Sequence, residues 1–159
     1  MSLKKLPIII NGKIIANEIT NELKCKIEKL HLKPGLGIIL VGDRKDSKTY
    51  IRMKKKACDK IGIINYDVKL SEHISENDLI KEIHKMNNNN NIHAILVQLP
   101  LPKHINEANI LNQISLKKDV DGFHVQNIGK LALKRIDGLS APCTPEGCIE
   151  LLRRYDISI

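Results

Sequence analysis

The run G-I-I-L-V-G, from Gly37 to Gly42, is a continuous aliphatic stretch bounded by glycine at both ends. A strand with one face in water alternates apolar and polar residues, whereas a strand covered on both faces is apolar throughout, as in parallel sheets. The stretch therefore predicts a buried strand of a parallel sheet. The loop G-D-R-K-D-S then leads from Gly42 to Ser47 and into a helical pattern, which Asp46 or Ser47 could cap.

The helical pattern from Ser47 to Gly62 carries one charged residue on its apolar side. At ~100° per residue, Lys54 falls on the same arc as the apolar residues of the segment, namely Tyr50, Ile51, Met53, Ala57, Cys58 and Ile61. Tyr50 and Lys54 are four residues apart, so their side chains meet. Burial lowers the pKa of a lysine and lets it exchange protons near neutral pH. Lys54 is therefore a catalytic candidate, and the alternative is a lysine whose charged end reaches water.

Strand and helix patterns alternate along the rest of the chain. Further strands are predicted at Ile63–Leu70 and His93–Leu99, and helices at Ile14–Leu32, from Ser75 to the asparagine run, at Ile105–Ile114 and at Ile149–Tyr155. Such alternation is typical of βαβ units with right-handed crossovers. The sequence predicts an α/β fold, a three-layer αβα arrangement with a mostly parallel sheet.

Two boundaries follow from local chemistry. The five asparagines Asn87–Asn91 are poor helix formers and are expected to end a helix and form a loop. In P-C-T-P-E-G, from Pro142 to Gly147, Thr144 is expected to cap the last helix, with Pro145 at its first position. The backbone N–H groups at such a start could hold an anion.

Polar residues are expected where strands end. In open α/β sheets, ligands bind beyond the carboxyl ends of the strands, which selects the loop before Tyr50, Gln98, and the segment Lys118–Gly122. The alternative for Gln98 is an amide satisfied by neighbouring backbone. Of Asp119 and Asp121, one is expected to form the turn and the other to accept hydrogen bonds from amine groups of a ligand. Too few further oxygen ligands follow for a calcium site.

Length and composition narrow the class of protein. The 159 residues suit one domain, and no apolar run approaches the ~20 residues of a membrane span. No signal-peptide pattern starts the chain, so we expect a cytoplasmic protein without a membrane partner. The four cysteines form no C-x-x-C pair and the histidines are scattered, which indicates reduced thiols and no metal site.

The chain is basic. Lysine and arginine exceed aspartate and glutamate by 26 − 18 = +8, yet only 3% of residues are aromatic. Few side chains are therefore available to stack on bases, and nucleic acid is not an expected partner. Long-range attraction of an anionic small molecule remains open.

Several strings resemble one known family when taken together. They are L-G-I-I-L-V-G from Leu36, Tyr50 with Lys54, I-L-V-Q-L-P-L-P from Ile95, K-D-V-D-G-F from Lys118, N-I-G-K-L from Asn127 and P-C-T-P-E-G from Pro142. In this combination and order, the chain resembles the bifunctional methylenetetrahydrofolate dehydrogenase/methenyltetrahydrofolate cyclohydrolase family. In that family the first loop usually reads V-G-x-x-P-A-S, and here the Pro-Ala pair is absent.

The resemblance implies an oxidoreductase and hydrolase of one-carbon metabolism and purine biosynthesis. Such enzymes oxidise 5,10-methylenetetrahydrofolate to the methenyl form with NADP, then hydrolyse it to 10-formyltetrahydrofolate. In them, the lysine matching Lys54 is the general acid/base, and the tyrosine matching Tyr50 packs on the folate. The glutamine matching Gln98 hydrogen-bonds that lysine and tunes it.

The resemblance also implies the substrate contacts and the domain plan. The aspartate matching Asp121 anchors the pterin ring, and Val97 and Leu99 flank the substrate. Residues 1–155 would form the folate-binding catalytic domain, and residues 156–159 would begin the junction to a Rossmann-type NADP domain. A full-length member would form a homodimer.

Two alternatives compete with this interpretation. No G-x-G-x-x-G occurs in the sequence, so we expect no NADP site within these residues. The chain could then be a truncated, non-catalytic α/β module that binds folate or another partner. The pair Tyr50-x-x-x-Lys54 is also found in short-chain dehydrogenases, but those enzymes carry a glycine-rich loop before it, which this sequence lacks.

Overall fold

A three-stranded parallel sheet lies at the base of the molecule. The computed structural model describes residues 7–134 and 140–158. Strand β1 (Gly35–Val41) is central, with β2 (Ile64–Leu70) and β3 (Ala94–Val97) on either side, and both pairings are parallel. The strand predicted from the glycine-bounded run is therefore the middle strand, and the predicted parallel sheet is confirmed.

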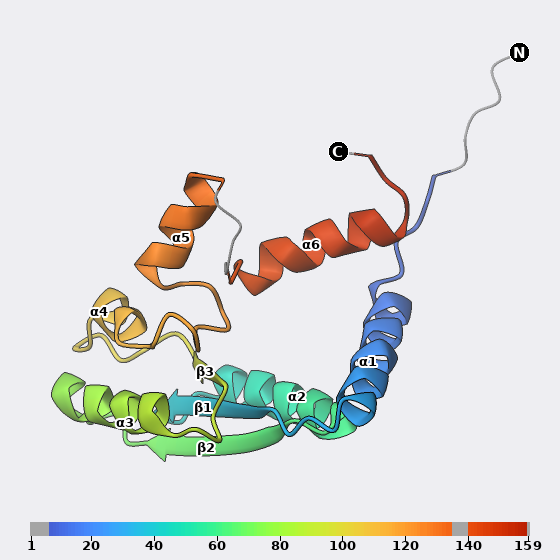
Figure 1. The fold of residues 1–159 in the computed structure, drawn as a ribbon. Helices are drawn as coiled ribbons and strands as arrows, with labels where there is room; N and C mark the ends of the chain where they lie inside the picture. The colour runs from blue at the N-terminus through green and yellow to red at the C-terminus, as the bar shows by residue number, and fades with distance from the viewer. Residues whose placement is uncertain (1–6, 135–139, 159) are drawn as a thin grey trace, which may run out of the picture.

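Helices cover both faces of the sheet, which gives the predicted three layers (Figure 1). Helix α2 (Lys45–Ile61) lies on one face and α3 (Glu76–Asn88) on the other. Alternate residues of β1 point to opposite faces, which is why this strand is apolar throughout. Ile39 and Val41 join the core on the α3 side, where Leu79 and Ile83 are fully buried.

The largest apolar cluster combines the sheet with α3 and the short helix α4 (Glu107–Asn112). Its buried members are Ile39, Val41, Leu79, Ile83, Met86, Ile92, Ile95, Val97, Leu101, Ile105, Ile110 and Ile114. Every predicted apolar segment from residue 37 to 114 contributes to it except the helix of Lys54, which packs on the opposite face. The segments that follow β3 are therefore packed on this core.

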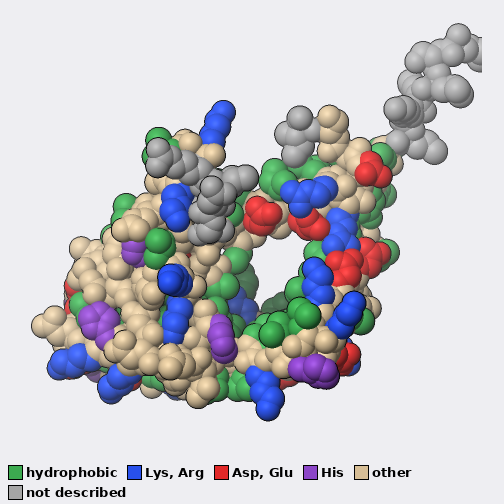
Figure 2. Space-filling model, in the orientation of Figure 1, with side chains coloured by type: hydrophobic (Ala, Val, Ile, Leu, Met, Phe, Trp, Pro, Cys, Tyr) green, Lys and Arg blue, Asp and Glu red, His purple; other side chains and the backbone are tan. Residues whose placement is uncertain are grey.

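The two ends of the described chain meet away from the sheet. Helix α1 (Gly12–Lys29) extends away from the edge of the sheet. Helix α6 (Cys143–Arg154) lies above the sheet in the view of Figure 1. Arg154 donates to both carboxylate oxygens of Glu22 at 2.7 and 2.8 Å. Helix α5 (Val125–Ala132) stands beside α6, and Figure 2 shows the molecule hollowed between these helices and the sheet.

Two helices begin earlier than their sequences indicate. Helix α2 begins after Arg44, and Asp46 lies in its first turn, where its carboxylate accepts hydrogen bonds from Arg44 and from the Ser47 amide. Helix α6 begins after Pro142, whose carbonyl accepts from the amide of Glu146. The predicted caps Asp46, Ser47 and Thr144 are therefore wrong, because each residue already lies inside its helix.

The asparagine run is part helix and part turn. Asn87 and Asn88 continue α3, so the prediction that the whole run is a loop is wrong for these two residues. The Asn87 side chain donates to the carbonyl of Gln113 at 2.7 Å and accepts from the amide of Ser115 at 2.9 Å. These tertiary hydrogen bonds outweigh the low helix propensity of asparagine.

Within the described ranges, no helix has both the length and the hydropathy that a bilayer crossing requires.

Candidate functional site

A cleft of about 690 Å³ opens along β3, on the side of the sheet that faces α2. Its walls are α2, the end of β3, the segment 120–123 and the start of α6. All six residues selected from the sequence line it: Tyr50, Lys54, Val97, Gln98, Leu99 and Asp121. Segments far apart in the chain therefore bring these side chains together, although their chemical roles stay predictions.

Lys54 and Gln98 face each other across the cleft. Nζ of Lys54 donates to Oε1 of Gln98 at 3.4 Å, and both residues are half-buried. The amide nitrogen of Gln98 donates to the carbonyl of Leu99 at 2.8 Å, which turns its oxygen toward the lysine. The backbone bond predicted as the alternative for Gln98 is therefore present, and it orients the amide that receives Lys54; a role of Gln98 in ligand binding stays a prediction.

Only part of the apolar arc of α2 is buried. Tyr50 and Met53 are 61% and 64% exposed, whereas Ser47, Cys58 and Ile61 are buried. The helix is rotated so that the edge carrying Tyr50 and Lys54 lies over the open cleft. The helical projection, which places Tyr50 on the apolar side of the helix, therefore does not predict its exposure, although Tyr50 and Lys54 line the same cleft.

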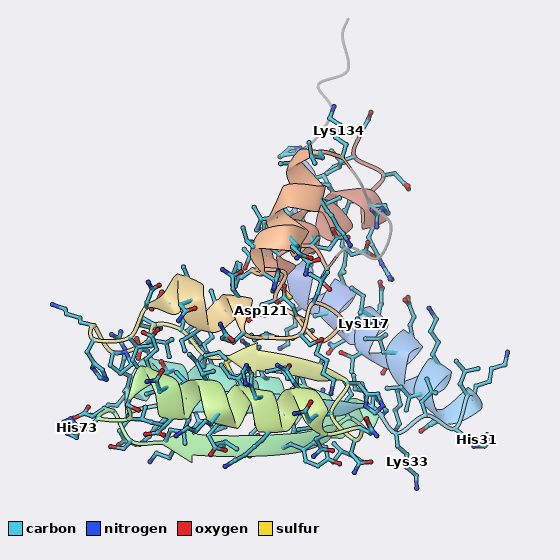
Figure 3. The ribbon with its side chains drawn as sticks, turned by 60° about the vertical axis from the view of Figure 1, so that its left-hand side comes forward. His31, Lys33, His73, Lys117, Asp121 and Lys134 are labelled. Carbon is cyan, nitrogen blue, oxygen red and sulfur yellow. The ribbon has the colours of Figure 1, made fainter. Side chains whose placement is uncertain are left out.

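Asp121 closes the other side of the cleft, and Figure 3 shows it between β3 and α5. The Cys143 thiol donates to the Val120 carbonyl at 3.4 Å and lies 3.8 Å from Oδ1 of Asp121. Burial raises the pKa of the Asp121 carboxyl, while the charge of Lys54 and the thiol of Cys143 oppose that rise and Asp119 adds to it. Asp121 is thus a partly desolvated acceptor opposite a cation.

The other aspartate forms the turn. Asp119 is 2% exposed, and its carboxylate accepts from the amides of Gly122 and His124. The turn pattern alone left open which aspartate faces the cleft, and this geometry places Asp119 in the turn and Asp121, the residue that the family resemblance selects, at the cleft.

The model of the tetrahydrofolate dehydrogenase/cyclohydrolase catalytic domain matches residues 10–121. The chain belongs to this tetrahydrofolate dehydrogenase/cyclohydrolase family. The resemblance inferred from the sequence strings is therefore confirmed.

Individual relatives of this family are similar over nearly the whole chain. The bifunctional protein FolD 2 of Arabidopsis thaliana is 54% identical over 155 residues, which are 95% of this chain and 52% of that protein. The bifunctional FolD of Campylobacter jejuni has a solved structure that matches 94% of this chain and 54% of its own, with 42% identity and a TM-score of 0.90.

A third relative is the Trypanosoma brucei N5,N10-methylenetetrahydrofolate dehydrogenase-cyclohydrolase, solved with NADP cofactor and inhibitor. It matches 97% of this chain and 54% of its own, with 35% identity and a TM-score of 0.91. The chain thus spans about half the length of the relatives it matches.

The loop from Gly42 to Ser47, where the chain departs from the usual family string, lies outside the cleft. Asp43 and Arg44 line a separate hollow of about 610 Å³ with His73 and Lys103. Asp43 pairs with Lys48 at 2.6 Å and with Lys69 at 2.7 Å, which turns the loop toward β2. The expectation that this loop borders the same crevice as Gln98 is wrong, because Asp43 and Arg44 line the separate hollow and not the cleft.

Sequence reasoning passed over several residues that line the cleft, among them an aromatic ring and a thiol. Phe123, the one phenylalanine of the chain, and Cys143 both line the cleft. Each stood within a quoted string, K-D-V-D-G-F or P-C-T-P-E-G, but neither spacing nor periodicity singled it out. An aromatic residue directly after the turn of Asp121 was the available signal for Phe123.

Two features of residues 7–134 and 140–158 bear on the binding of a metal and of a dinucleotide. No group of three metal-ligating side chains occurs in these ranges. The turn between β1 and α2, where a glycine-rich loop would cradle phosphate, has Gly42 followed by the carboxylate of Asp43 and the Arg44–Asp46 pair. That turn does not fit the NADP expected of the family.

Proposed function

We propose that this chain is the folate-binding, catalytic part of a bifunctional enzyme of one-carbon metabolism. That enzyme oxidises 5,10-methylenetetrahydrofolate to the methenyl form with NADP and hydrolyses the product to 10-formyltetrahydrofolate. The observation that carries the proposal is the Lys54–Gln98 hydrogen bond opposite Asp121 within one cleft. The Campylobacter and Trypanosoma relatives are both methylenetetrahydrofolate dehydrogenase/cyclohydrolases, which supports the same reaction pair.

Substrate binding would use both polar and apolar walls. The carboxylate of Asp121 accepts hydrogen bonds and has none to give, so it suits the amine groups of a pterin. The apolar side chains of Val97 and Leu99 would flank the ring, and Tyr50 would pack on the folate from α2. The exposure of Tyr50 leaves its ring free to cover a bound ligand.

Hydrolysis would use Lys54 as the general acid/base. The oxygen of water bonds to the methenyl carbon while a proton passes from that water to the amine of Lys54 acting as base. The bond from that carbon to the ring nitrogen then breaks, and the nitrogen takes a proton. Water thus supplies the formyl oxygen, one of its protons ends on the freed nitrogen, and the other is released.

Oxidation requires a hydride acceptor that these residues do not hold. NADP supplies that chemistry when it is bound, and we assign its site to a further domain. Residues 1–155 would then be the folate domain, and residues 156–159 the start of the junction. From the resemblance we also propose a homodimer for the full-length protein, a cytoplasmic location and a role in purine biosynthesis.

Calorimetry with tetrahydrofolate tests the binding site. We expect the 159-residue chain to bind it and Asp121→Ala to raise the Kd by roughly tenfold or more, the effect of losing a charged hydrogen-bond partner. Glu28→Ala, which removes a carboxylate on α1 outside the cleft, should leave the Kd unchanged. No measurable binding by the native chain, or equal Kd values for all three proteins, would contradict the proposal.

A further inference from the structure

The turn that carries Asp121 is held from within by a buried pair of polar side chains. Asp119 is 2% exposed and Asn127, on α5, is 1% exposed. The amide nitrogen of Asn127 donates to Oδ2 of Asp119 at 2.7 Å. Helix α5 is therefore joined to the turn by a hydrogen bond to a charged group, and such bonds are among the stronger ones in proteins.

The remaining bonds of Asp119 shape the backbone around Asp121. Oδ1 accepts from the amide of Gly122 at 3.1 Å, and Oδ2 also accepts from the amide of His124 at 2.9 Å. Gly122 follows Asp121 directly, so the carboxylate of Asp119 closes the loop from which Asp121 projects into the cleft.

Backbone contacts also hold the two ends of the same turn. The amide of Ile95 donates to the carbonyl of Lys118 at 2.7 Å, which attaches the start of the turn to β3. Gly122 has φ +70°, and a Cβ there would lie 2.4 Å from the Ser140 carbonyl oxygen. The end of the turn is therefore packed on the segment before α6. Between these anchors, Asp119 and Asn127 supply the side-chain support.

Stability alone does not account for the amide at residue 127. Its Oδ1 is buried and has no hydrogen-bond partner within the part of the chain that the structure describes. An unpaired buried oxygen is costly, and an apolar side chain of the same shape would avoid that cost. What the amide provides and an apolar group cannot is the bond to Asp119.

We propose that Asn127 is a positioning residue for the folate reaction: it holds Asp119, and Asp119 sets the place of Asp121 in the cleft. This inference rests on the proposed function, because it concerns the carboxylate that would anchor the pterin. Asn127 itself does not line the cleft.

The test compares Asn127→Leu with Gln126→Leu in the 159-residue chain. Leucine keeps the shape of asparagine and removes the unpartnered oxygen together with the bond, so the variant should fold. We expect Asn127→Leu to raise the Kd for tetrahydrofolate on the order of tenfold. In hydrolysis of methenyltetrahydrofolate, the KM should rise by a similar factor while kcat changes by less than about twofold, because Lys54 and Gln98 are untouched. Gln126 is exposed on the same helix, and its variant should match the native chain.

A double-mutant cycle identifies the route of the effect. If Asn127 acts through Asp121, Asn127→Leu should change the Kd by less than about twofold in a chain that already carries Asp121→Ala. An equal loss in both backgrounds would overturn the inference, as would an unchanged Kd and KM for Asn127→Leu. If that variant does not fold, Asn127→Ala enters the same cycle with the same criteria.

The outcomes separate this inference from the proposed function. If the native chain binds tetrahydrofolate and Asp121→Ala weakens it, the proposed site stands, and only the Asn127 results decide the positioning role. If the native chain does not bind, the function fails and the inference fails with it.

Discussion

At the scale of single residues, the side chain of Gln98 decides where the amine of Lys54 rests. The backbone bond from Gln98 to Leu99 fixes the amide, and the amide oxygen then receives Nζ at 3.4 Å. A lysine without such an acceptor would extend into water. The strand-end glutamine thus provides the acceptor that holds the amine of Lys54 at the wall of the cleft.

Lys54→Met should remove the hydrolysis of methenyltetrahydrofolate and leave the fold intact. Methionine keeps the apolar stem of lysine but cannot transfer a proton, so a loss of about 10²-fold or more is expected. The rate is followed by the absorbance of the methenyl form and the fold by circular dichroism. Lys56→Met, on the exposed side of the same helix, serves as the control. Hydrolysis that survives in Lys54→Met would remove this residue from the proposed chemistry and favour a module that only binds folate.

The titration of Asp121 should appear in the pH dependence of binding. Burial raises the pKa of this carboxyl, so it takes up a proton at a higher pH than an exposed aspartate. The ionised form accepts hydrogen bonds from the pterin, and tetrahydrofolate affinity should fall as the pH drops through that raised pKa. Calorimetry from neutral to acid pH measures the midpoint. A midpoint at or below that of an exposed aspartate would contradict the assignment.

Ionised Asp121 is expected to favour ligand binding above its raised pKa, but at the same pH values it lowers the stability of the fold. A group whose pKa is raised by folding is costly when ionised, so Asp121 weakens the fold above its unfolded-state pKa. Asp121→Asn should therefore be at least as stable as the native chain at neutral pH. The difference should shrink as the pH falls through the raised pKa, which denaturant unfolding at several pH values would show.

At the scale of elements, the C-terminus of α3 is held by one lysine. Nζ of Lys118 donates to the carbonyls of Met86, Asn87 and Asn89 at 3.2, 2.7 and 2.9 Å. Carbonyls at a helix C-terminus carry partial negative charge and lack partners within the helix. Lys118 thus fastens the segment of Asp121 to the helix that packs on the sheet.

Lys118→Met should destabilise the chain by about 2–4 kcal/mol, because several hydrogen bonds to a charged group are lost and carbonyls are left unpaired. Urea unfolding followed by circular dichroism gives the free energy. Lys117→Met, at the exposed neighbouring lysine labelled in Figure 3, should change it by less than about 0.5 kcal/mol. Similar losses in both variants would mean that the three carbonyl bonds do not stabilise α3.

At the scale of the whole molecule, the two ends of the chain are joined by a small network. Arg154 donates to Glu22 of α1 and to Glu150 of its own helix, and the hydroxyl of Tyr155 accepts from the amide of Asn11 at 2.8 Å. The first turn of α6 lines the cleft, so this network at the other end of α6 helps to place one wall. Arg154 lowers the pKa of Glu22 through its hydrogen bond.

Arg154→Gln should lower the melting temperature relative to the native chain. Added salt should reduce this difference in melting temperature, because ions screen the pairing of surface charges. A carboxylate whose pKa is lowered by folding stabilises the fold above its unfolded-state pKa. The difference should therefore also disappear as the pH falls through the lowered pKa of Glu22. Arg153→Gln is the control, since Arg153 pairs with Glu150 within one helix. An equal loss in Arg153→Gln would show that the link between α1 and α6 contributes nothing.

The sequence by itself determined the central strand and the identity of the cleft residues. A run that is apolar at every position, such as Gly37–Gly42, has to be covered on both faces, and a polar residue such as Gln98 at the end of a strand has to find a partner. These local properties predicted the parallel sheet and drew attention to Tyr50, Lys54 and Gln98, and the family resemblance added Val97, Leu99 and Asp121; all six line the cleft.

Only the tertiary structure decided how those residues are oriented and supported. In the folded chain, α2 is oriented so that Tyr50 is exposed. Asp119 forms the turn while Asp121 lines the cleft, and Asp43 lies in a separate hollow. Each outcome depends on a partner distant in the chain, such as Asn127 for Asp119 or Lys69 for Asp43. Local sequence patterns do not predict such partners, because hydrogen bonds and ion pairs between distant segments form only when the chain has folded.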